Sequence, residues 1–313
     1  GYIINVMVIR KNFSDIANTW DTILANNDSH APFFTHAWHR LWFEVLGKDW
    51  EPYLLVIDDV VVAPFAKKNN EVIFSGGAEI SDYQDLVGPH EKKQETWQQI
   101  LEHGKNDGVT SFHFRNIPES SPTVSFFQKF SHATVAQEDT TPTITLPATW
   151  DAHIESLPYK ERHELRRKLR KIEKEHHNPT IAVSTDPARD ITILLDLMRH
   201  DAEKQAFLTP DMTVFFQKIA STFAADISLL ILYMGDKPSA ATLSFIADQS
   251  YMLYNSGFDK ECCPYAGFYL KAMSIKYALD KGLKEYNFLQ GSERYKYDLG
   301  GRDRFVYSVD LAL

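Results

Sequence analysis

The sequence predicts an α/β (α+β) protein made of two tandem units, each with a mixed β-sheet. Three observations support this. The chain has 313 residues, which is room for two domains of about 150 residues each. Helical and strand-like patterns follow one another in the same order in both halves. A run of charged helix formers at 158–174 separates the halves. We therefore expect one unit at 1–149 and a second at 150–313, led by that charged helix.

The first half begins with two expected helices between strand patterns. Ser14 is a suitable N-cap for a helix over 14–26, and Thr35 for a helix that ends at Gly47. Asp58 and Asp59 form the expected turn between two strands. The other elements expected in this half are strands at 3–9, 53–57, 60–66, 72–74 and 111–115, and a helix at 95–105.

The second half repeats this order after the charged helix. Thr209 and Pro210 have the composition of a helix start, and Gly282 ends a helix that begins near Ala266. The other elements expected here are an amphipathic helix at 190–206, strands at 227–233, 239–247, 249–257 and 285–289, a helical turn at 292–298, and a final strand at 305–311.

Composition limits the classes of function. Lys and Arg number 33 and Asp and Glu 42, a net charge of −9, so general binding to nucleic acid is not expected. Aromatic residues make up 13% of the chain, enough for a core. Cys262 and Cys263 are adjacent and cannot form a disulfide scaffold, which favours the cytoplasm. No apolar run has the ~20 residues of a membrane span. No signal peptide is evident, although a removed targeting segment stays open because residue 1 is Gly.

Two stretches of the second half resemble a known signature. Residues 254–259 read YNSGFD, Gly267 opens the following helix, and residues 286–296 read YNFLQGSERYK. These runs resemble the Y-x-S-G-F-D … D-F-x-x-G-x-x-x-Y-K signature of CelD/BcsL-type acetyltransferases. That type belongs to the GNAT superfamily and is related to the FemAB-like peptidyltransferases, which have two tandem GNAT units. The resemblance spans about residues 32–310, including PFF at 32–34 and SDYQDL at 81–86. It departs at Asn287, where the family often has Asp.

The resemblance implies that the second unit binds an acyl-CoA donor, with acetyl-CoA as the first candidate. It implies no metal cofactor. The thioester would lie between parting strands at 249–257 and 285–289, and its pyrophosphate at a helix N-terminus. The residues assigned to the donor are Asn255, Ser256, Gly257, Phe258, Tyr265, Ala266, Gly267 and Phe268. Of the spaced glycines of the usual phosphate loop only Gly267 is well placed. The alternatives are that Gly267 serves helix packing, or that the donor is an acyl carrier protein or aminoacyl-tRNA.

Three residues near the end of the signature are the catalytic candidates. Tyr295 is the candidate acid for the leaving thiolate, with a buried core tyrosine as the alternative. Lys296 matches the Fem-type lysine that stabilises an oxyanion or a substrate phosphate, with a surface lysine as the alternative. Glu293 is the nearest carboxylate and a candidate base, or else an exposed helix residue.

The acceptor is expected at the first unit and at the charged helix. On a strand, Tyr83 and Asp85 would share one face and Asp82 would lie on the other. These side chains could hold a cationic or polyhydroxyl acceptor, or else cap a turn. Arg162 and Arg166 form a basic stripe that could contact a phosphate, while internal ion pairs on a solvated helix are the alternative.

No metal site is expected. The twelve histidines show no ligand spacing, and the pair His176 and His177 lacks an identifiable third ligand. There is no glycine-rich nucleotide loop and no serine nucleophile elbow either.

The sequence thus predicts a bacterial-type acyltransferase that acts on an amine or hydroxyl of a sugar or a cell-envelope or polysaccharide precursor. One alternative is aminoacyl transfer from tRNA, although only about thirty residues separate the halves and the Fem pattern commonly has a helical hairpin in its second unit. Another is a catalytically silent GNAT-like binding protein. An acyl carrier protein and peripheral membrane contact stay open as partners.

Overall fold

The computed structural model describes residues 7–175 and 179–313. The chain divides into two compact units: Gly1–Asp139 with Phe305–Leu313, and Thr140–Arg304. The expected boundary at 149/150 falls inside the second of these units. The first part of the strand expected at 3–9, and the pair His176 and His177, lie outside the described residues.

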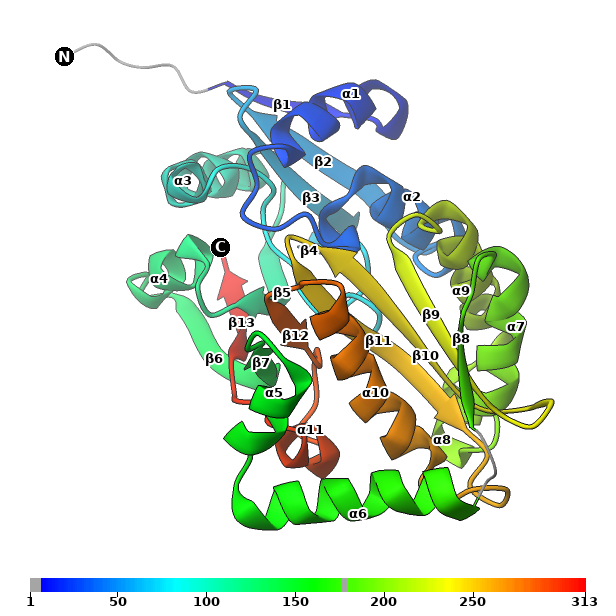
Figure 1. Ribbon diagram of the computed structural model, residues 1–313. Helices are drawn as coiled ribbons and strands as arrows, with labels where there is room; N and C mark the ends of the chain where they lie inside the picture. The colour runs from blue at the N-terminus through cyan, green and yellow to red at the C-terminus, as the bar shows by residue number, and fades with distance from the viewer. Residues whose placement is uncertain (1–6, 176–178) are drawn as a thin grey trace. The chain divides into compact units, whose positions relative to one another are not determined.

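The first unit contains a seven-stranded sheet in the order β1-β2-β3-β4-β5-β13-β6 (Figure 1). Strands β1 to β4 are antiparallel neighbours, β4 and β5 run parallel, and β5 and β13 run antiparallel. The strands are β1 (Val8–Lys11), β2 (Glu51–Ile57), β3 (Val61–Lys68), β4 (Glu71–Phe74), β5 (Ser111–Pro118), β6 (Ala133–Thr140) and β13 (Phe305–Ala312). The helices are α1 (Phe13–Leu24), the 3-10 helix η1 (Pro32–Phe34), α2 (His36–Val45), α3 (His90–Asn106) and α4 (Pro122–Gln128).

Side-chain caps set the starts of the first two helices. Thr35 caps α2 as expected, since its side chain accepts a hydrogen bond from the Trp38 amide at 3.3 Å. Asn12, rather than Ser14, caps α1, and its Oδ1 accepts from the Asp15 amide at 2.9 Å. Ser14 cannot be the cap because it lies already inside the first turn, whereas Asn12 is extended and directly precedes the helix.

The second unit contains a six-stranded sheet in the order β7-β12-β11-β10-β9-β8. Its strands are β7 (Thr143–Thr145), β8 (Thr180–Val183), β9 (Ile227–Met234), β10 (Lys237–Ala247), β11 (Ser250–Phe258) and β12 (Glu285–Asn287). Its helices are α5 (Trp150–Ser156), α6 (Tyr159–Glu175), α7 (Pro187–Met198), α8 (Ala202–Phe207), α9 (Pro210–Thr222), α10 (Ala266–Asp280) and α11 (Arg294–Asp298). Thr209 caps α9 through the Met212 amide, and Gly282 follows α10 with a positive φ of 73°, both as the sequence indicates.

Both sheets have the same pairing pattern, which supports the predicted duplication. In the second unit β8 to β11 are antiparallel, β11 and β12 run parallel, and β12 and β7 run antiparallel. The expectation that the final strand closes the second unit is wrong. β7 pairs with β12 there, while β13 pairs with β5 in the first unit. The alternating pattern of a strand shows which of its faces is buried but does not specify which sheet it joins.

Two other segments differ from expectation. Residues 81–86 form no strand. Their backbone meets the sheet at separate points, first where the Gln84 amide donates to the Asn116 carbonyl of β5 and then at the isolated bridge between Val62 and Val87. The amphipathic stretch at 190–206 forms two helices rather than one. Its break is at Asp201, whose carboxylate caps α8 by accepting from the amides of Glu203 and Lys204.

Helices cover both faces of the second sheet. Neighbouring side chains on β11 point to opposite faces. A Cβ added at Gly257 would lie 2.4 Å from the backbone nitrogen of Met198 in α7, so this face packs closely on α7. Phe258 points to the other face, where its ring would lie 2.7 Å from a Cβ added at Gly267 in α10. β11 pairs with β12 in the interior of this sheet, between the helices on its two faces.

Candidate active site

β11 and β12 part after three paired residues. Their last parallel pair is Met252 with Asn287, while β11 continues to Phe258 with only β10 as its partner. Beyond β12 the chain turns away, with the Phe288 amide bonded to Pro142 and Leu289 at a positive φ of 58°. The pairing of β10 and β11 also shifts register between Leu243 and Ser244. Such an irregularity re-aims backbone groups beside a site. The parting expected of a thioester-binding site is therefore present.

Asn255 and Ser256 lie at the part of β11 that has no β12 partner. The Ser256 amide donates to Asn255 Oδ1 at 2.9 Å. The Ser256 carbonyl accepts a hydrogen bond from the Lys204 ammonium, which reaches over from α8. Of the predicted donor residues, Asn255 and Ser256 thus lie at this edge. Gly257 and Phe258 serve the packing of the sheet on α7 and α10.

The start of α10 lacks a side-chain cap. Tyr265 occupies the N-cap position without a capping hydrogen bond, and the Ala266 amide donates to the Cys263 carbonyl. A helix N-terminus carries partial positive charge and suits a phosphate. Gly267 is required here for close packing against Phe258, so the packing alternative holds as well. The four predicted residues 265–268 do lie together at this helix start.

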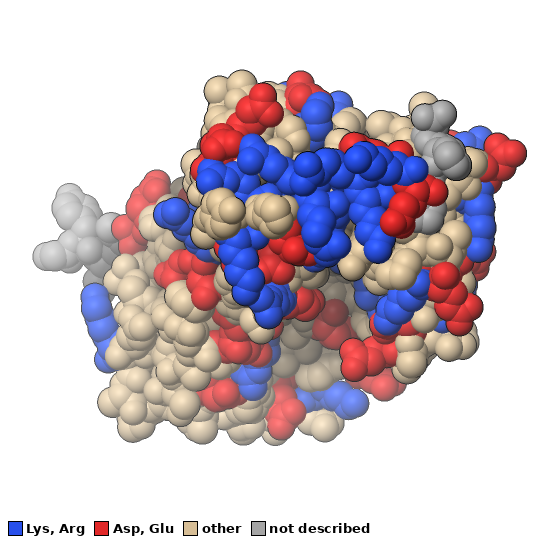
Figure 2. Space-filling model, turned by 60° about the horizontal axis from the view of Figure 1, so that its bottom comes forward, with Lys and Arg blue, Asp and Glu red and all other residues tan. Residues whose placement is uncertain are grey.

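Cations of α6 surround the start of α10. Three of them lie over the Tyr265 ring, at 5.8 Å for Arg167, 5.7 Å for Lys168 and 5.2 Å for Lys171. Lys168 Nζ also lies 4.2 Å from the Phe268 ring centroid. A hydrogen bond from Arg167 lowers the pKa of the Tyr265 phenol. Figure 2 shows the basic side chains gathered in one band on this side of the molecule. Positive charge from two elements therefore converges where a phosphate would sit.

The predicted pair Arg162 and Arg166 lies on another stripe of α6. Both guanidinium groups form ion pairs with Glu155 of α5, at 2.7 Å for Arg162 and 2.5 Å for Arg166. These arginines therefore have a carboxylate partner within the protein. The cations at the start of α10 are their neighbours along the helix.

The three catalytic candidates lie close together. Lys296 is 2% exposed, and its ammonium donates to the carbonyls of Gln290 at 2.6 Å and Gly291 at 3.1 Å and forms an ion pair with Glu293 at 2.9 Å. Lys296 therefore holds the turn that follows β12. Burial would raise the pKa of Glu293, but its bond to Lys296 lowers it below the ordinary value. Burial and the Glu293 charge raise the pKa of Tyr295 well above its ordinary range, so its hydroxyl keeps its proton.

Two further lysines at this place were not predicted from the sequence. Lys271 of α10 points its Nζ at the Tyr295 ring, 3.9 Å from the centroid. Burial, with the charges of Lys204 and Lys296, lowers the pKa of Lys271 to about 7. Burial also lowers the pKa of Lys204. The available signal was the position of Lys271, four residues after Gly267 on the same face and the only charged residue in the first half of that helix.

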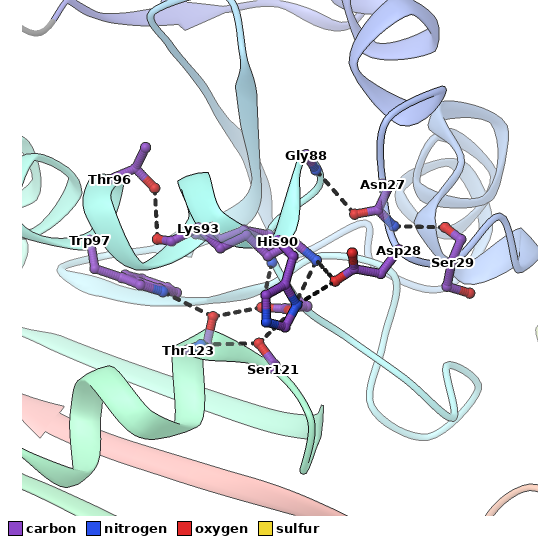
Figure 3. Close-up of polar contacts among 12 residues, drawn as sticks. Asn27, Asp28, Ser29, Gly88, His90, Lys93, Thr96, Trp97, Ser121 and Thr123 are labelled. Carbon is purple, nitrogen blue, oxygen red and sulfur yellow. Dashed lines mark hydrogen bonds and ion pairs between the residues drawn. The ribbon is translucent and has the colours of Figure 1, made fainter.

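The predicted acceptor residues of the first unit do not form an open site. Asp82 and Tyr83 are half-buried. Asp85 is 3% exposed, and its carboxylate accepts hydrogen bonds from Ser121 at 2.6 Å, Thr123 at 2.7 Å and Lys93 at 3.4 Å. Figure 3 shows this network, in which Trp97 also bonds to Thr123. Asp85 holds elements together in the core, so its carboxylate is not open to the cationic or polyhydroxyl acceptor that the sequence suggested.

A cavity of about 370 Å³ lies beside this network in the first unit. Its lining includes His90, Gln94, Ser121, Ser125 and Tyr307. Among residues 7–175 and 179–313, no group of three or more His, Cys, Asp or Glu side chains could hold a metal. In the same residues, no helix combines the length and the apolar character that crossing a membrane requires.

Comparisons with known proteins bear on the fold and on residues 159–297. Residues 159–297 match the acetyltransferase (GNAT) domain family. No curated protein matches the chain in sequence. Similar solved structures include the C-terminal domain of a putative lysylphosphatidylglycerol synthetase from Agrobacterium fabrum, with TM-score 0.65 and 11% identity over 96% of this chain and 92% of that one. FemX has TM-score 0.64 and 11% identity over 98% and 97%. A tandem GNAT protein from the clavulanic acid biosynthesis pathway has TM-score 0.55 and 10% identity over 97% and 98%.

Proposed function

We propose that this GNAT-type acyltransferase takes its acyl group from acyl-CoA, with acetyl-CoA as the first candidate, and transfers it to an amine or hydroxyl. The observation that carries the proposal is the start of α10. An uncapped helix N-terminus lies there under Arg167, Lys168 and Lys171, beside the point where β11 and β12 part. A diphosphate and a thioester joined by a pantetheine arm need such a pair of neighbouring sites.

The chemistry proposed is direct transfer. The acceptor nitrogen or oxygen attacks the thioester carbonyl carbon, the carbon–sulfur bond breaks, and the thiolate takes a proton while the acceptor loses one. Tyr295 is the proposed acid, because its hydroxyl keeps its proton and lies next to Lys271 and Glu293. Lys296 positions the turn after β12 through its bonds to backbone carbonyls. Its buried positive charge would also favour an oxyanion nearby.

The acceptor proposed is a sugar or a cell-envelope or polysaccharide precursor, as in CelD/BcsL-type enzymes, which the YNSGFD run resembles. The proposed location is the cytoplasm, and Cys262 and Cys263 are both free thiols. A second candidate is aminoacyl transfer from tRNA. It is favoured by the basic band on α6 and by the structural similarity to FemX.

Thermal unfolding with each donor tests the proposal. A ligand at about 100 times its dissociation constant stabilises a protein by about 2.7 kcal/mol. We expect acetyl-CoA to raise the midpoint more than free CoA does. If no CoA thioester raises it but an aminoacyl-tRNA does, the acyl-CoA proposal fails and the second candidate replaces it.

Matched variants on α6 test the phosphate site. Lys168→Gln and Lys171→Gln each remove one charge at the start of α10, and we expect each to weaken acetyl-CoA binding about tenfold, as for loss of one charged hydrogen bond. Arg166→Gln removes the same charge from the stripe paired with Glu155 and serves as the control, with less than about a twofold effect. Equal losses in all three variants would mean that only the general charge of α6 matters.

A further inference from the structure

Three ammonium groups converge beside the parted strands of the second unit, and they come from separate elements. Lys204 lies on α8, Lys271 on α10 and Lys296 on α11. Lys204 bonds to Ser256 of β11, Lys271 lies over the Tyr295 ring, and Lys296, the next residue, pairs with Glu293. The charges of Lys204 and Lys296 both act on Lys271. Glu293, at the start of α11, is a carboxylate whose negative charge raises the pKa of both Lys204 and Lys271.

The three lysines differ in how well the protein satisfies them. The Lys296 ammonium has three backbone carbonyls and Glu293 as partners. Lys204 reaches the carbonyl and hydroxyl oxygens of Ser256. Lys271 contacts the Tyr295 ring, and within the described parts of the chain no hydrogen-bond acceptor meets its ammonium. An ammonium ion has three donors, so Lys271 and Lys204 keep donors that a ligand can use.

The charge around Lys271 is also unbalanced. Glu293 is already paired with Lys296 at 2.9 Å and its side chain is 58% exposed. Asp201, which acts on Lys204, pairs with Lys260 at 3.0 Å. Gathering like charges in a partly desolvated place is unfavourable unless an anion joins them or a proton leaves. The two lysines therefore form an incomplete ion cluster.

We propose that Lys204 and Lys271 bind an anionic group, a carboxylate or a phosphate, of the acyl acceptor. This inference rests on the proposed acyltransferase function, because that function defines what the acceptor is. The anion site itself does not depend on which acyl donor the protein uses. An anion held between α8 and α10 would lie beside the free edge of β11, where the proposed thioester carbonyl belongs. It would orient an acceptor whose nucleophile is a short distance from its negative charge.

Sulfate and acetate are suitable probes because their charges do not change between pH 6 and 9. Binding is measured by the rise in the thermal unfolding midpoint, with ionic strength held constant by chloride. We expect one or both anions to raise the midpoint of the unaltered protein, and Lys271→Met and Lys204→Met to lose at least about 80% of that rise. Lys276→Met is the matched control, since Lys276 lies on the same helix, is exposed and pairs with Asp280 at 2.8 Å.

The pH dependence of anion binding gives a second measurement that does not need a folded Met variant. Because burial and neighbouring lysines lower the pKa of Lys271 to about 7, its charged fraction falls about fivefold from pH 7 to pH 8, and anion affinity should fall by up to that factor. The groups facing it are Lys204, Glu293, Tyr295 and Lys296. Lys271→Arg keeps its charge over this range and should retain binding with most of the pH dependence removed.

Anion binding that is equal in the unaltered protein and in Lys271→Met would overturn the inference. So would absence of any midpoint rise, or a loss confined to Lys168→Met, which would place the anion at the start of α10. Acetyl-CoA binding, measured on the same variants, tests the proposed donor separately. Binding of glucosamine is then compared with binding of glucosamine 6-phosphate to test for a phosphate. Binding of glycinamide is compared with binding of glycine to test for a carboxylate. A preference for the phosphate or the carboxylate member should disappear in Lys271→Met.

Discussion

The buried carboxylate of Asp85 offers a sharp test of how the first unit is held together. Asp85→Ala removes the acceptor of two hydroxyl hydrogen bonds and the partner of the buried Lys93 ammonium, which is 4% exposed. Removing one member of a buried ion pair costs about 3–5 kcal/mol, because the remaining charge stays desolvated. The stranded hydroxyls of Ser121 and Thr123 can turn toward other acceptors and add less. We therefore expect the free energy of unfolding to fall by about 4 kcal/mol.

Urea unfolding followed by tryptophan fluorescence is the assay. Five of the six tryptophans lie in the first unit, so the signal reports mainly on that unit. Asp28→Ala is the control. Asp28 also approaches Lys93, at 3.7 Å, but its side chain is 47% exposed and its loss should cost less than about 1 kcal/mol. The double variant Asp85→Ala with Lys93→Met should recover part of the loss, since no unpaired charge remains.

A change below about 1 kcal/mol in Asp85→Ala would refute this account of the network. Unchanged stability combined with weaker acceptor binding would instead restore the role that the sequence suggested for Asp85.

Three other predictions concern local features. Because the pKa of Lys271 is lowered in the folded state, the unfolded chain binds more protons between pH 7 and 10, so this group's contribution to stability rises with pH over that range. In Lys271→Met that contribution should be absent from the pH profile of urea unfolding. Asn12→Ala should cost about 1 kcal/mol, whereas Ser14→Ala should cost less than half of that; the reverse order would mean that Ser14 caps α1 after all. Gly257→Ala should cost about 1–3 kcal/mol, because its Cβ would lie 2.4 Å from the Met198 backbone nitrogen, and an unchanged unfolding midpoint would contradict this close contact.

Local signals predicted several of the helix starts and ends. The caps Thr35 and Thr209 and the stop at Gly282 depend on a few neighbouring residues, and the structure has all three. The uncapped start of α10 follows from the same kind of signal. A cap is visible in sequence because its partners lie within one turn.

Contacts between distant segments could not be predicted in this way. Asp85 meets Ser121 and Thr123 across more than thirty residues, so an alternating pattern at 81–85 looked like a strand. Lys204 and Lys271 lie on separate helices, and no periodicity in the sequence links them. On α6 the sequence identified the stripe of Arg162 and Arg166, but no local signal showed that Glu155 of α5 pairs with both.

The pairing of β13 with β5 has a consequence for how the chain folds during synthesis. Residues 140–304 form a continuous segment, so the second unit can fold once that segment has left the ribosome. The first unit has a gap between β5 and β6 in its sheet until residues 305–312 emerge. Residues 7–139 therefore keep unpaired strand edges until residues 305–312 have followed. A chain truncated before residue 305 would therefore contain all of the second unit and a first unit that lacks β13.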